Sequence, residues 1–127
     1  MDSIHKKLVT MLLQPERLGA PSTTGLPFMI ENGITRQQVE RIDFELPVPN
    51  SRINLQVSAY LPHRGCDAII YLHTHSGMRL EGRDAAIGGL DRGLGAVLFD
   101  FRGNGDSTGE YVSFGWNEAE DLEHVGF

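Results

Sequence analysis

Hydrophobic and polar residues alternate in two neighbouring segments of the chain, and this alternation predicts a pair of β-strands. The alternation is imperfect over residues 39–47 and clean over residues 53–61. Between them lies Pro49-Asn50-Ser51, a group of residues typical of a tight turn. Because a short polar turn joins the two segments, we expect them to form an antiparallel β-hairpin.

Two uninterrupted apolar segments follow, at residues 68–72 and 95–99. Continuous apolar runs of this length are typical of strands that are covered on both faces, as in a parallel sheet. Residues 82–94, between them, have the apolar spacing of a helix, so the three segments predict a β-α-β crossover. A second helix is expected over residues 116–125, with Asn117 as its N-terminal cap.

The order of these elements predicts an α/β fold in two parts. Residues 1–36 are expected to form a leader that starts with a short helix and then becomes irregular, because residues 14–36 are rich in proline and glycine. Residues 37–127 are expected to form the first part of an α/β sheet, a β-hairpin followed by a β-α-β unit. Only two parallel strands are predicted and no strand follows the last helix, so we expect this sheet to be incomplete.

Composition and charge narrow the range of functions. The chain has 11 Lys and Arg against 17 Asp and Glu, a formal net charge of −6. Nucleic acids and anionic membranes attract basic surfaces, so we expect neither as a partner. Cys66 is the only cysteine, which excludes an internal disulfide and fits a reducing compartment. Since no segment resembles a membrane span or a signal peptide, we expect a cytoplasmic protein.

Two polar segments hold the residue types that suit catalysis. Residues 71–79 and 100–109 each follow one of the predicted parallel strands. In open α/β sheets, the loops at the carboxyl ends of the strands build the binding site. The first segment contains His73, Thr74 and His75, and the second is rich in glycine and charged residues. We therefore expect both segments to lie at the same edge of the sheet.

On these residues the chain resembles the α/β-hydrolase superfamily, and within it the esterase and serine-aminopeptidase-like lineages, over residues 39–126. The loop after the third strand of that family commonly begins with His-Gly, and it supplies a backbone N–H to the oxyanion hole. The resemblance implies that His73 takes the histidine position and that the backbone around Thr74 and His75 is the oxyanion donor region. Thr74 stands where the family usually has glycine, which implies a reshaped loop.

The second loop matches the family pattern Asp-x-Arg-Gly-x-Gly-x-Ser-x-Gly at all its fixed positions, which are Asp100, Arg102, Gly103, Gly105, Ser107 and Gly109. Residues 105–109 also fit G-x-S-x-G, but a nucleophile elbow needs its serine on a sharp turn between a strand and a helix. Ser107 lies several residues after the predicted strand and well before the next helix. We interpret Ser107 as a loop residue bonded to local backbone, and Arg102 and Asp100 as residues that fix the loop through a charge-assisted bond.

The resemblance implies hydrolysis of ester, thioester or amide bonds in a small-molecule or peptide substrate, by a serine nucleophile and without a cofactor. In the family, the nucleophile, the acid and the catalytic histidine follow the fifth strand, which would lie beyond Phe127. We therefore expect a truncated serine-hydrolase-like chain that is inactive alone. The sequence leaves open whether the chain is an enzyme, what its substrate is and what its oligomeric state is.

Two other functions stay open. The triplet from His73 to His75 resembles the opening motif of the PHP-type metal-dependent phosphoesterases, in which two histidines one residue apart bind a metal. No later Asp-His pair supplies further ligands, and the second loop fits the hydrolase pattern better, so we expect no metal site. The other possibility is a non-enzymatic fragment that binds a partner through an exposed strand edge.

Overall fold

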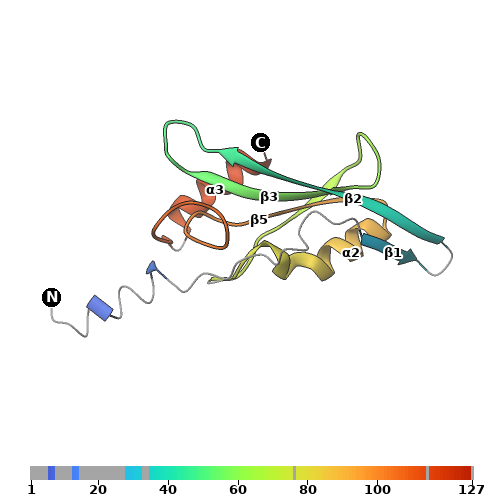
Figure 1. Cartoon of the computed structure of the whole chain (residues 1–127), viewed down its shortest axis with the longest axis horizontal. Coiled ribbons are helices and arrows are strands. Elements are labelled where there is room, and N and C mark those ends of the chain that lie inside the picture. The colour runs from blue at the N-terminus through green and yellow to red at the C-terminus, as the bar shows by residue number, and fades with distance from the viewer. Residues whose placement is uncertain are drawn as a thin grey trace.

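A computed structural model describes residues 6–7, 13–14, 28–32, 35–75, 77–113 and 115–126 of the chain. Its strands form one sheet in the order β1-β2-β3-β5-β4, and helices pack against it (Figure 1). The elements along the chain are β1 (Phe28–Asn32), β2 (Thr35–Pro47), β3 (Asn54–Leu61), β4 (Ala68–Tyr71), the 3₁₀ helix η1 (Arg79–Gly82), α2 (Arg83–Asp91), β5 (Gly95–Phe99) and α3 (Trp116–Gly126).

The predicted β-hairpin is confirmed. β2 pairs antiparallel with β3 in a register that places Phe44 opposite Val57. In the turn, Asn50 has a positive φ of 59°, a conformation that asparagine adopts more readily than most residues. The Ser51 hydroxyl donates to the Val48 carbonyl at 2.7 Å and accepts from the Ile53 N–H at 3.1 Å. These bonds close the turn that the polar residues predicted.

The β-α-β crossover is confirmed as well. β4 pairs parallel with β5, and β3 pairs antiparallel with β5 on its other side, so the sheet is mixed. The helical segment between the parallel strands divides into η1 and α2. Gly89 weakens the helix in isolation, but a Cβ at this position would lie only 2.9 Å from Ile69 Cδ1. The glycine therefore allows α2 to pack closely against β4.

Two hydrophobic clusters lie on opposite faces of the sheet, because neighbouring residues of β5 alternate between them. The cluster under α2 consists of Val39, Tyr60, Ala86, Leu90, Ala96 and Leu98. The cluster under α3 consists of Val48, Leu55, Val57, Phe99 and Phe101, with Leu122 and Val125 of the helix packed against it. The result is the layered α/β architecture expected from the sequence, with a helix on each face of the sheet.

The structure differs from the prediction in the segment expected to be irregular. Residues 28–32 form β1, which pairs antiparallel with the first residues of β2. The proline and glycine that indicated a loop, Pro27 and Gly33, flank this strand rather than interrupt it. Of the predicted N-terminal helix, residues 6–7 and 13 are helical, and its apolar positions 4, 8, 11 and 12 lie outside the described residues. The boundary proposed at residue 36 stays a prediction.

The last helix begins where the sequence predicted, at Trp116, but its cap is different. Asn117 is inside the helix, and its backbone N–H donates to the Ser113 hydroxyl at 2.7 Å. The prediction of Asn117 as the cap was therefore wrong, and Ser113 performs this role. Within the described ranges, no helix is long and apolar enough to cross a bilayer.

The two-sided packing of β5 leads to a first prediction. Leu98 is fully buried, so Leu98→Ala is expected to lower the free energy of unfolding by about 2–5 kcal/mol, as large-to-small core substitutions do. Leu61 is 42% exposed, so Leu61→Ala is the matched control and should cost about 0.5 kcal/mol. Urea unfolding followed by circular dichroism measures both. Equal losses in the two variants would contradict the assignment of Leu98 to the core.

Candidate functional site

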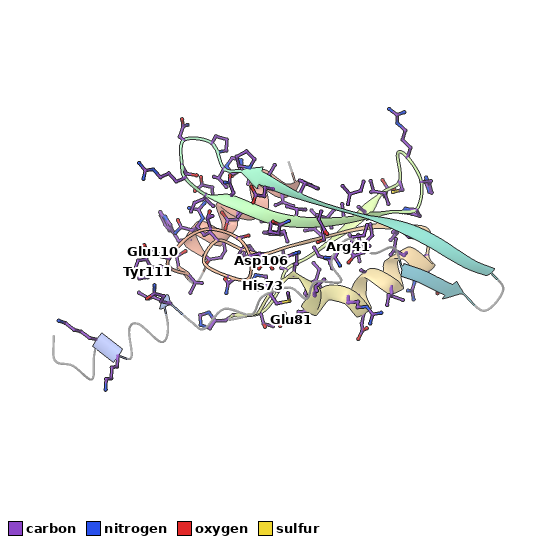
Figure 2. All side chains as sticks on the ribbon, in the orientation of Figure 1. Arg41, His73, Glu81, Asp106, Glu110 and Tyr111 are labelled. Carbon is purple, nitrogen blue, oxygen red and sulfur yellow. The ribbon has the colours of Figure 1, made fainter. Side chains whose placement is uncertain are left out.

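The two polar loops predicted from the sequence meet at the carboxyl ends of β4 and β5, and His73 joins them. Its Nδ1–H donates to the Thr74 carbonyl at 2.7 Å, and its Nε2 accepts from the Phe101 N–H at 3.0 Å. These partners assign the neutral Nδ1–H tautomer. The His73 ring also makes an edge contact with the Phe101 ring, with the centroids 5.0 Å apart. His73 is buried, and it fixes one loop against the other (Figure 2).

Asp100 is a second residue that holds the loop after β4 to the loop after β5. Its carboxylate is fully buried and accepts the backbone N–H of Arg79 at 2.5 Å and the Arg79 Nη1 at 2.6 Å. It also accepts the backbone N–H of Asp106 at 2.9 Å. Gly105 has a φ of +49°, and a Cβ there would fall on the Asp100 carboxyl group. Glycine is therefore required for the loop to close around this carboxylate.

Arg79 is buried, and its guanidinium group belongs to a network of hydrogen bonds and ion pairs that crosses the sheet. Arg79 Nε donates to the Ser58 hydroxyl at 2.9 Å, and Ser58 in turn donates to Asp43 at 2.6 Å. Arg41 pairs with Asp43 at 2.9 Å, and its Nη2 donates to Ser58 at 3.2 Å. Opposite charges therefore alternate along the network, which satisfies the buried guanidinium groups. Sequence reasoning gave none of Ser58, Asp43 and Arg41 a role.

Arg102 attaches the second loop to α3. Its backbone N–H and its Nε each donate to a different oxygen of Asp121 at 2.8 Å. Asp121 is fully buried, and Arg102 Nη2 lies 2.7 Å from the same carboxylate. The sequence predicted that Asp100 and Arg102 fix the loop, and the structure gives each a separate partner on another element. Only the acidic start of the helix was visible in the sequence, so Asp121 was missed as the partner.

Ser107 lies in the loop between β5 and α3, and its hydroxyl bonds to backbone on both sides. It donates to the Asp100 carbonyl at 2.5 Å and accepts from the Gln56 N–H of β3 at 2.8 Å. The residue is 1% exposed. Thr108 extends the same contact, since its hydroxyl accepts from the Asn54 N–H at 2.7 Å. These bonds attach the loop to the neighbouring strand.

The loop after β4 is held by Glu81 of η1 (Figure 2). Its carboxylate accepts the Thr74 backbone N–H and the Thr74 hydroxyl, each at 2.7 Å. The Thr74 carbonyl accepts the Gly77 N–H at 2.9 Å and so closes a turn that contains His75. The hydrogen bond from the Thr74 hydroxyl is the main reason that the pKa of Glu81 lies below its usual value. The Thr74 amide is thus committed to Glu81, and sequence reasoning missed this partner.

A cavity of about 150 Å³ opens beside the joined loops. The residues that line it are His73, Thr74, His75, Phe101, Asn104, Val112, Gly115 and Glu118. It therefore includes both residues of the predicted oxyanion donor region, together with His73. Arg102 and Ser107 are not among the lining residues. Asn104, Val112 and Glu118 were not among the residues that the sequence singled out.

Glu118 closes the cavity at the start of α3. Its carboxylate accepts the Ser113 backbone N–H at 2.8 Å, the Ser113 hydroxyl at 2.6 Å and the Gly115 N–H at 3.1 Å. Burial by itself would raise the pKa of Glu118, but these hydrogen bonds outweigh it and lower the pKa below the usual value of 4.5. A charged carboxylate therefore lines the cavity at neutral pH.

The arrangement of the histidines does not favour a metal centre. Both ring nitrogens of His73 are engaged in hydrogen bonds within the protein. Across the part of the chain that the structure describes, no three His, Cys, Asp or Glu residues lie close enough to hold a metal ion. The geometry supports an interpretation in which His73 orients backbone and does not ligate.

Comparison with solved structures relates this chain to an esterase. Two crystal forms of the Pyrococcus furiosus esterase Pf2001 match it with TM-scores of 0.56 and 0.57 and sequence identities of 28% and 27%. Each match covers 68% of this chain and 33% or 35% of the esterase, so the chain spans about one third of that protein. No family model and no curated protein sequence matches. The chain is a small α/β unit with an esterase-like fold.

The buried ion pair at the centre of the site yields the second prediction. Removing one partner of such a pair leaves an uncompensated charge, so Asp100→Asn is expected to cost about 3–5 kcal/mol of unfolding free energy. The matched control is Asp106→Asn, because Asp106 pairs with the same arginine at 3.1 Å but its side chain is 43% exposed. The control should cost about 1 kcal/mol or less. Urea unfolding that ranks the two variants in the opposite order would contradict this assignment.

The third prediction concerns pH. Because the pKa of folded Glu118 is below 4.5, the stability it contributes is present above pH 4.5 and is lost as pH falls through the folded pKa. Glu118→Gln should therefore melt at a lower temperature than the parent chain at pH 7, and this difference in melting temperature should become smaller below pH 4.5. Thermal unfolding of both chains between pH 7 and pH values below 4.5 measures the difference. Glu123→Gln, an exposed position of the same helix, is the control. If Glu123→Gln shows the same pH-dependent difference in melting temperature from the parent, the effect arises from net charge and not from the Glu118 hydrogen bonds.

Proposed function

We propose that this chain carries the oxyanion side of an ester-hydrolysing site, and that it belongs to a serine hydrolase of the α/β-hydrolase superfamily. The observation that carries the proposal is the similarity to a solved esterase over 68% of the chain, at 28% identity. The motif loops that resemble the superfamily lie side by side at the carboxyl ends of β4 and β5, where open α/β sheets bind their ligands.

The chemistry that this half of a site supplies is stabilisation of negative charge. In ester hydrolysis the carbonyl oxygen becomes an oxyanion, and preorganised N–H groups at about 2.7–3.1 Å stabilise it. Thr74 donates its amide to Glu81, which fixes the turn. The following amide, that of His75, is the donor that we assign to the oxyanion. His73 orients this loop through its bonds to Thr74 and Phe101.

The nucleophile is proposed to come from outside residues 1–127. The Ser107 hydroxyl is buried and bonded to the backbone of two elements. Ser58 is committed to the arginine and aspartate network. An active serine needs a histidine base within hydrogen-bond reach, and these hydroxyls are used in holding the fold. Residues 1–127 alone are therefore expected to be catalytically silent.

The experiment for the fourth prediction compares this chain with the protein as it occurs in its source. An antibody against residues 37–127 isolates that protein, whose intact mass is then measured. It is expected to hydrolyse p-nitrophenyl acetate and to react with a fluorophosphonate probe at a serine outside residues 1–127. Recombinant residues 1–127 are expected to do neither, because the site lacks its nucleophile.

Three outcomes would contradict the proposal. Turnover by recombinant residues 1–127 that Ser107→Ala abolishes would assign the nucleophile to Ser107. The absence of both turnover and probe labelling in the source protein would remove the esterase function and favour a non-enzymatic binding role. Zinc- or manganese-dependent phosphatase activity, lost when His73 and His75 are changed to alanine, would favour metal-dependent phosphoester hydrolysis.

A further inference from the structure

Asn104 lines the cavity beside the oxyanion loop. Its backbone is fixed, since its N–H donates to the Phe101 carbonyl at 3.0 Å and its carbonyl accepts the Ser107 N–H at 3.1 Å. The residue is only 4% exposed and lines the cavity. In the described portion of the chain, its side-chain amide makes no hydrogen bond. Among the described residues, Arg102 Nη2 is the one fully enclosed side-chain atom without a hydrogen bond, so the Asn104 amide is reached by solvent, and a ligand in the cavity can take the place of that solvent.

The size and walls of the cavity restrict that ligand. Its volume is about 150 Å³. An apolar cavity of about that volume binds benzene, so the ligand has about six non-hydrogen atoms within the cavity. Phe101 and Val112 are buried apolar residues of the lining, and His75 brings the oxyanion loop to it. A short hydrocarbon chain that ends in a polar group matches apolar side chains that lie beside the Asn104 amide.

Charge restricts the ligand further. Glu118 lines the same cavity and is held in its ionised form by the Ser113 and Gly115 hydrogen bonds. A like charge inside a partly closed cavity is repelled, so a carboxylate is disfavoured there. The Asn104 amide donates to a carbonyl oxygen without needing a charge on it. The chemistry thus favours a neutral carbonyl group over an anion.

We infer that the cavity binds the acyl part of a short-chain neutral ester, and that Asn104 donates a side-chain N–H to the acyl carbonyl oxygen. The choice of an ester rests on the function proposed above, and the preference for a short neutral carbonyl compound rests on the cavity alone. Hydrolysis adds water across the ester C–O bond and gives an alcohol and a carboxylic acid, which loses its proton to the solvent. The resulting carboxylate is repelled by the negative charge of Glu118, and this repulsion favours release of the product.

The test uses a matched pair of ligands on recombinant residues 1–127. Butyramide and butyrate have nearly the same shape, but only butyrate is charged at pH 7. Titration of the ¹⁵N-labelled chain is expected to shift the Asn104 side-chain signals with butyramide, and butyrate should bind about tenfold more weakly. Asn104→Leu identifies these signals by their loss and should weaken butyramide binding by about tenfold, since one hydrogen bond is removed.

Two further variants separate binding from folding. Val112→Phe fills the cavity while Asn104 stays in place, so it should abolish binding. Asn117→Leu makes the same chemical change on α3 outside the cavity and should leave binding unchanged. The backbone spectrum of each variant reports whether the fold is retained. If every folded variant binds butyramide like the parent chain, or if the parent binds neither ligand, the inference is overturned.

The outcomes distinguish this inference from the proposed function. Binding requires no nucleophile, so butyramide binding at Asn104 together with an inactive source protein would overturn the esterase proposal alone. An active source protein whose kcat/KM for p-nitrophenyl butyrate is unchanged by Asn104→Leu would overturn the binding site alone. If both are correct, that variant should raise KM for short-chain esters more than for long-chain esters, whose acyl groups exceed the cavity.

Discussion

The carboxylate of Asp100 is the group on which the geometry of the site depends. It lies at the end of β5 without solvent contact, and such a charge is tolerated only when it is paired and fully hydrogen-bonded. Arg79 supplies the counter-charge from the loop after β4, and the Asp106 amide supplies a further donor from the loop after β5. Because both loops must close around one group, the ion pair sets the position of each relative to the other.

The other polar side chains of the two loops follow the same principle. The side chains of His73 and Ser107 each bond to backbone of a different segment, and the Asp121 carboxylate accepts the backbone N–H of Arg102, so each of these bonds fixes the main chain. This pattern suits a site whose contribution is an oriented backbone amide, since such a donor must be in place before charge develops on the substrate. Ser107 and Arg102 are not among the residues that line the cavity, whereas His73 and Asn104 are.

The hairpin, the crossover and α3 could be predicted because local periodicity and turn residues define them. β1 could not, because its formation depends on pairing with the start of β2, and its flanking proline and glycine are also typical of loops. The partners of the site charges were missed for a related reason. Asp100 bonds Arg79, 21 residues away, and Arg102 bonds Asp121, 19 residues away, and no spacing rule links residues of different elements. The position of each loop could be predicted, but its hydrogen-bond partners required the tertiary structure.

Thr74 stands where the α/β-hydrolase pattern that this chain resembles usually has glycine. Glycine at this position gives a loop its conformation through freedom of the backbone, and threonine does not have this freedom. Here the Glu81 carboxylate accepts hydrogen bonds from both the amide and the hydroxyl of Thr74, and glycine could donate only the first of these because it has no hydroxyl. The lowered pKa of Glu81 keeps the carboxylate ionised at neutral pH, so the turn is held by charge-assisted bonds. A side chain of η1 thus restrains the turn that contains His75.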